Sequence, residues 1–146
     1  MLFNYAVSRM DNLTRWLMKI KAGYLLLGVL GAVVTIAPPA AAEPSNKWRI
    51  AVNHSANVAG ELEFSLTPEG AQASSLVVPI PAGTHENRVA HLIRDAIRKQ
   101  YGTSLYKTEI DDGEDVLVKV RGRNPDIDLV LVRNTAEGLS LHLSRE

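Results

Sequence analysis

One stretch of the chain repeats its apolar residues at helical spacing, and it lies between two groups of segments that alternate instead. This stretch runs from residue 84 to residue 102. Its spacing predicts a single amphipathic helix with one buried face. The apolar residues on the predicted face are Val89, Ile93, Ala96, Ile97 and Tyr101.

The ends of the predicted helix carry residues that suit those positions. Thr84 is expected to cap the N-terminus, because its hydroxyl can accept a hydrogen bond from a free backbone N–H. Glu86 falls in the first turn, where the helix dipole favours an acidic group. Gly102 is expected to end the helix, since glycine adopts the left-handed conformation of a C-terminal cap.

Several of the remaining segments alternate apolar and polar residues, which predicts strands with one solvated face, and Ser75–Ile80 is a short apolar run. Asp112 and Gly113 between two such runs indicate a hairpin. Pro79 has no N–H to donate, so its strand is expected to end there or to lie at an edge, and the last strand is expected to form another edge. The predicted strands are Lys47–Asn53, Gly60–Thr67, Ser75–Ile80, Leu105–Ile110, Asp115–Val120, Ile127–Val132 and Gly138–Ser144.

The predicted order of elements is therefore βββ-α-ββββ. We expect an α+β fold, in which one helix packs on one face of a mostly antiparallel sheet. Residues 43–146 have the size of a single domain.

A secretory signal is predicted ahead of this domain. Lys19 and Lys21 form a short basic region, and Gly23–Ala37 is an uncharged, mostly apolar run. The run is shorter than the roughly 20 residues that a membrane span requires. This combination is typical of a signal peptide.

The predicted cleavage site follows the apolar run. Ala40 and Ala42 supply the small-residue pattern that a signal peptidase needs, so we expect cleavage between Ala42 and Glu43. Counted from Met18 the signal has an ordinary length, so Met18 is the expected start and residues 1–42 form the signal region. The alternative is that the segment stays in place as an N-terminal anchor.

Charge and cysteine content argue against several classes of protein. Residues 43–146 hold 12 basic and 15 acidic side chains. A nucleic-acid binder would need a basic face, and docking on an anionic bilayer would need basic clusters. Cysteine is absent, so disulfides, thiol catalysis and thiolate metal sites are excluded. We expect a periplasmic or secreted domain without a cofactor, and without membrane contact after cleavage.

The stretch VPIPAGTHENRVAHLIRDAIRKQY, residues 78–101, resembles a small α+β module of phage-tail and other bacterial surface or filament proteins. In that module a strand ends in an Ala-Gly-Thr turn, and a helix and a polar hairpin follow. The resemblance implies a structural or interaction domain, and it transfers no site residues. The matching residues are Ala82, Gly83, Thr84, Val89, Ala90, Ile93, Ala96 and Ile97.

Two charged turns are the candidate contacts with a partner protein. The acidic turn surrounds Gly113, and its spacing departs from the twelve-residue calcium loop, so we interpret it as a solvated hairpin turn. The basic turn surrounds Gly122. The partner-contact candidates are Asp111, Asp112, Glu114, Asp115, Arg121 and Arg123.

Three further residues define an enzymatic or metal-binding alternative. His91 and Asp95 are four residues apart on the predicted helix and can share a face, which makes them candidate metal ligands. His142 alternates with two serines on the last strand. A hydrolase or metal site would require these three side chains to converge.

The expected function is a non-enzymatic interaction or structural domain of the bacterial cell envelope. Its partner is expected to be another protein, which a free strand edge can bind by strand addition. The alternatives are a small periplasmic hydrolase or metal-binding protein that uses His91, Asp95 and His142, and an inhibitor of an envelope enzyme.

Overall fold

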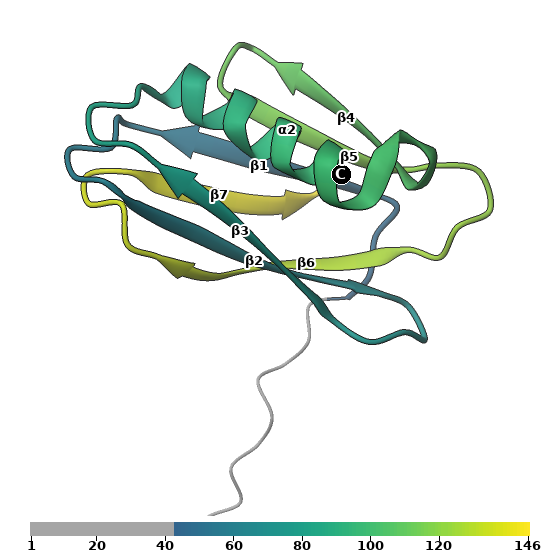
Figure 1. Cartoon of the computed structure of the whole chain (residues 1–146). Coiled ribbons are helices and arrows are strands. Elements are labelled where there is room, and N and C mark those ends of the chain that lie inside the picture. Colours follow the sequence, from purple (N-terminus) through teal and green to yellow (C-terminus); the bar gives the residue numbers. More distant parts are fainter. Residues whose placement is uncertain (1–42) are drawn as a thin grey trace, which may run out of the picture. The chain divides into compact units, whose positions relative to one another are not determined.

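The computed structural model describes residues 43–146, which form seven strands and one helix (Figure 1). The predicted order βββ-α-ββββ is confirmed. The signal region and its predicted cleavage residues Ala40 and Ala42 lie outside the described residues. The elements are β1 Lys47–Asn53, β2 Gly60–Pro68, β3 Ser74–Ile80, α2 Glu86–Leu105, β4 Tyr106–Asp111, β5 Asp115–Val120, β6 Ile127–Asn134 and β7 Ser140–Arg145.

The strands form two antiparallel sheets. One sheet has four strands in the order β4-β5-β1-β7, and the other has three in the order β3-β2-β6. The alternation seen in the sequence places every second side chain in the core between the sheets and the helix. The largest buried side chains are Phe64, Ile50, Leu62, Leu66, Ile80, Ile93, Ile97 and Ile127.

The helix α2 packs its apolar face, including Val89, Ile93 and Ile97, against this core. The sequence predicts that the helix ends at Gly102. Its helical backbone is interrupted there, since Gly102 has φ 76° and ψ 169°, but helical residues continue to Leu105. The prediction that Leu105 begins a strand is therefore wrong.

The predicted cap at Thr84 is also wrong. The residue at the N-cap position is His85, and its side chain makes no capping hydrogen bond. The Thr84 hydroxyl instead donates to the carbonyl oxygen of Pro81 at 2.7 Å, in the turn before the helix. A short hydroxyl side chain often bonds a nearby backbone carbonyl in this way, in competition with capping.

The helix closes the open edges of both sheets on one side. It lies between β3 and β4, which are edge strands (Figure 1). Gln100 Nε2 donates to the carbonyl oxygen of Ser75 at 2.8 Å, and Arg98 Nη2 donates to that of Thr108 at 2.5 Å. The prediction that the strand of Pro79 lies at an edge is confirmed. This edge is a poor template for strand addition, because Gln100 already binds the carbonyl of Ser75 and Pro79 has no N–H to donate.

On the opposite side the two sheets are joined through the first residue of β6. Trp48 Nε1 donates to the carbonyl oxygen of Ile127 at 2.8 Å. Ser45 exchanges two backbone hydrogen bonds with the same residue, at 2.9 and 3.1 Å. Within residues 43–146 no helix has the length and apolar character needed to cross a bilayer.

Candidate functional site

The outer face of the four-stranded sheet is covered by paired charges. The strand register brings Lys47, Lys107 and Lys119 into one row, and Arg49 into the next row beside Leu117. Glu109 lies 2.6 Å from the Lys107 amine and 2.7 Å from the Lys119 amine. We call this surface the charge-paired face. Its charged residues are Lys47, Arg49, Lys107, Glu109, Asp111, Asp115, Lys119 and Glu146.

Arg49 is the centre of this network. Its guanidinium bonds Asp115 at 2.6 Å, Asp111 at 2.9 Å and also Glu146. The hydrogen bonds that Arg49 donates to Glu146, Asp115 and Asp111 raise the pKa of its guanidinium. The bonds that Arg49 and Lys47 make to Glu146 lower the pKa of that carboxyl to about 2. Four cations and four carboxylates therefore neutralise one another on this face.

The Glu146→Gln variant should lose a pH-dependent part of its stability. The pKa of Glu146 is lower in the folded protein than its ordinary value of 4.5. Its ion pairs therefore stabilise the fold above about pH 4.5, and their contribution disappears as pH falls towards 2. We expect the variant to melt at a lower temperature than wild type at pH 7, with a difference that shrinks below pH 4.5.

Thermal unfolding followed by circular dichroism between pH 2 and 7 measures this difference. The control is Glu137→Gln, since the exposed Glu137 side chain takes no part in the ion pairs of residues 43–146. If the difference in melting temperature between wild type and Glu146→Gln stays constant from pH 7 to 2, the role of Glu146 is contradicted.

Two carboxylates of the acidic turn already form ion pairs within the chain. Asp111 and Asp115 both bind Arg49, so they are anchored to the charge-paired face. Asp112 is exposed and has a positive φ of 50°, and Glu114 is half-buried beside it. Contact with a partner through this turn stays a prediction, and it rests mainly on Asp112 and Glu114.

The basic turn lies at the other end of β5 from the acidic turn. Arg121 and Arg123 are exposed there, on either side of Gly122. A polar depression of about 270 Å³ lies beside the turn, and Lys47 and Lys119 line it. Both lysines already pair with carboxylates. The structure therefore separates the two predicted contact turns by the length of a strand.

The three residues of the hydrolase alternative do not come together. His91 and Asp95 lie one turn apart on α2, and Asp95 accepts hydrogen bonds from Arg94 at 2.8 and 2.9 Å. His142 is paired with Ala51 on the outer face of the four-stranded sheet, whereas the helix packs on the inner face. No group of three His, Asp or Glu side chains in residues 43–146 is arranged to hold a metal ion.

A serine–histidine–glutamate cluster, which the sequence did not reveal, lies at the start of α2. The Ser55 hydroxyl donates to Glu86 Oε2 at 3.2 Å and lies 3.0 Å from His85 Nδ1. In a hydrolytic triad the histidine stands between serine and acid, whereas here the serine stands between the other two. The cluster therefore fastens the loop after β1 to the helix. The pKa of Glu86 is lowered first by a hydrogen bond from its own backbone N–H and then by the hydrogen bond from Ser55.

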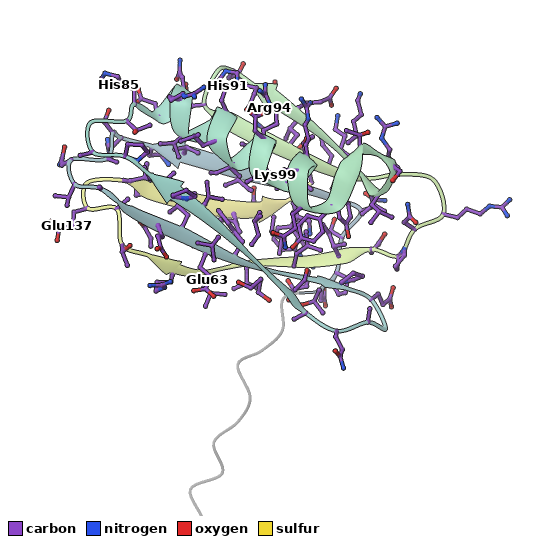
Figure 2. All side chains as sticks on the ribbon, viewed as in Figure 1. Glu63, His85, His91, Arg94, Lys99 and Glu137 are labelled. Atoms are coloured by element: carbon purple, nitrogen blue, oxygen red, sulfur yellow. The ribbon has the colours of Figure 1, made fainter. Side chains whose placement is uncertain are left out.

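The outer face of the three-stranded sheet differs from the charge-paired face because valines are exposed on it. Val77 of β3 is 47% exposed, and Val130 and Val132 of β6 are 40% and 58% exposed. Val77 is paired with Glu63 of β2, and Glu63 points away from the helix (Figure 2). A bulge leaves Val132 unpaired and turns the next residue, Arg133, towards Glu63.

The charged residues of this face lie between the valines. Arg133 Nη2 lies 3.1 Å from Glu61 Oε2, and Arg133 Nε lies 3.1 Å from Glu63 Oε2. One guanidinium is therefore shared by two carboxylates. We call this surface the valine face. It comprises Glu61, Glu63, Ser65, Ser75, Val77, Pro79, Val130, Val132 and Arg133.

A shallow depression of about 640 Å³ continues the valine face at the end where β2 begins. Pro79 and Pro81 line it together with Leu92 of the helix, and Glu61 and Arg133 line its polar side. The depression therefore presents apolar side chains between the end of β3 and α2. Comparisons with models of protein families, with curated proteins and with solved structures find no match to the chain.

Proposed function

We propose that residues 43–146 form a non-enzymatic protein-binding domain of an exported bacterial envelope protein. The observation that carries the proposal is the valine face, where three exposed valines lie on one face of a sheet and a depression lined by prolines and Leu92 lies at the end where β2 begins. Single exposed apolar side chains are ordinary on protein surfaces, but several on one face favour an interaction site.

The comparison between the two outer faces supports this choice of surface. On the charge-paired face every cation lies beside a carboxylate, so a partner that docked there would have to break or bury these ion pairs. On the valine face a partner would cover Val77 and Val130 and would gain free energy from each apolar side chain removed from water. Export rests on the signal pattern of residues 18–42.

Replacing Val77, Val130 and Val132 together with threonine should abolish binding of the partner and leave the fold intact. Threonine keeps the β-branched shape that suits a strand, while its hydroxyl makes burial of the position unfavourable. At three exposed positions the free energy of unfolding should change by less than about 1.5 kcal/mol in total. The measurement is the mass of the native complex in the envelope fraction, together with thermal unfolding.

The matched control is Leu105→Gln, which replaces an exposed apolar side chain outside the valine face. We expect wild type and this control to be recovered in a complex of the same mass. The triple variant should be recovered with the mass of the free chain. A triple variant that keeps the complex, with normal unfolding, would assign binding to another surface.

A further inference from the structure

The valine face carries more acid than base, whereas the charge-paired face is balanced. Glu61 and Glu63 share the single guanidinium of Arg133. Glu63 Oε1 accepts a further hydrogen bond only from a neutral hydroxyl, that of Ser75, at 3.1 Å. By contrast, Glu109 and Glu146 on the charge-paired face each have two cationic partners.

This acid surplus lies along the middle of the face. Glu61 and Glu63 are alternate residues of the central strand β2, so their side chains are about 7 Å apart. The register places Pro79 and Val77 beside them on β3, and Arg133 beside Glu63 on β6. A polypeptide that covers the valines therefore also covers these carboxylates.

Covering a carboxylate without a new cation is unfavourable, because the group loses water and gains nothing in return. A ligand with only apolar side chains would meet this cost at Glu61 and Glu63. A ligand that brings lysine or arginine would neutralise the surplus and would be attracted to the face before contact. Charge complementarity thus selects among the proteins that could bind.

We infer that the valine face receives a cationic amphipathic segment of a partner protein. Its lysine or arginine side chains meet Glu61 and Glu63, and its apolar side chains cover Val77, Val130 and the depression beside Leu92. This inference rests on the proposed binding function and adds the chemistry of the partner.

Peptide titrations followed by amide NMR shifts of the purified protein test the inference. The probes are an octapeptide of alternating valine and lysine, its valine–glutamate analogue and a serine–lysine analogue. We expect the valine–lysine peptide to shift amides of β2, β3 and β6 and to bind about fivefold or more tightly than either analogue. Its affinity should fall as salt rises, since exposed charge pairs are screened.

The Glu61→Gln/Glu63→Gln variant should reverse this preference. It leaves Arg133 as the charged group between the valines, so the valine–glutamate peptide should become the better ligand. The control Glu109→Gln removes a carboxylate from the charge-paired face and should keep the preference for lysine. Thermal unfolding of each variant shows whether it is folded before its peptides are compared.

Two results would overturn the inference. One is a wild-type protein that binds the glutamate peptide as well as the lysine peptide. The other is a control, Glu109→Gln, that weakens lysine-peptide binding as much as the double variant does. If the native complex still depends on the three valines in either case, the proposed function stands and only the charge assignment fails.

Discussion

The Gly60→Ala variant is expected to lose about 3 kcal/mol or more of its free energy of unfolding. A Cβ atom at this position would lie 2.4 Å from the backbone nitrogen of Ala136 and 2.4 Å from the carbonyl carbon of Thr135. Real Cβ atoms do not approach backbone so closely, and backbone cannot rotate away as a flexible side chain can. The loop after β6 would have to move.

That loop is held against the start of β2 by specific hydrogen bonds. The Thr135 N–H donates to the carbonyl oxygen of Glu61 at 3.0 Å, and the Glu61 N–H donates to Thr135 Oγ1 at 2.8 Å. Moving the loop would break these bonds and disturb Ala136, which is buried. Overpacking of this kind costs about 1–3 kcal/mol before hydrogen bonds are lost.

Chemical denaturation of Gly60→Ala beside Gly70→Ala measures the effect. Gly70 has a φ of 74°, and a Cβ atom at this position would meet no other atom within 4 Å, so its substitution tests backbone conformation alone. We expect this control to lose about 1–2 kcal/mol. Equal losses in the two variants would contradict the close approach of β2 and the loop.

The Phe64→Ala variant is expected to lose about 3–5 kcal/mol, which is a large share of the roughly 5–15 kcal/mol that stabilises an ordinary domain. Phe64 is 1% exposed and lies in the middle of β2, the central strand of its sheet. Its strand neighbours are Leu76 and Leu131. Neighbours on both sides are fixed in strands, so they cannot collapse fully into the cavity.

Denaturant titration of Phe64→Ala and of the adjacent Ser65→Ala separates the core from the surface. Ser65 points to the valine face, where substitutions cost within about 0.5 kcal/mol. A loss below about 1 kcal/mol for Phe64→Ala would mean that the core between the sheets is not packed as described.

The positions of the strands could be predicted from the sequence, because alternating apolar residues indicate which side chains of a strand are buried. The prediction for Lys47–Asn53 is confirmed at both ends, and so is that for Asp115–Val120. Their arrangement could not be predicted in the same way. β1 pairs with β5 and β7, which lie far along the chain, and no local pattern specifies such partners.

The valine face was hidden in the sequence for a related reason. Val77 and Val130 belong to the runs SLVVPI and IDLVLV, which have apolar residues at consecutive positions. Such runs do not alternate, so they do not indicate which residues lie on the solvated face. Pro79 indicates an edge strand, but an edge does not show which face of the sheet meets water.

The Ser55 cluster and the helix contacts to strand edges depend on residues that are distant in the sequence. Ser55 and His85 are brought together by backbone hydrogen bonds between the loop after β1 and the turn before α2, at Ala56, Gly83 and Thr84. In the sequence, Arg98 and Gln100 look like ordinary exposed residues of a helix. Their role at the edges becomes visible only when β3 and β4 are placed beside the helix.

Photo-crosslinking from position 132 shows directly whether the valine face binds a partner protein. A photoreactive side chain at Val132 is compared with one at Lys107 on the charge-paired face, both in the native envelope fraction. We expect one discrete adduct from position 132, which disappears when Val77 and Val130 are changed to threonine. A discrete adduct from position 107 with none from position 132 would show that the valine face is not the binding surface.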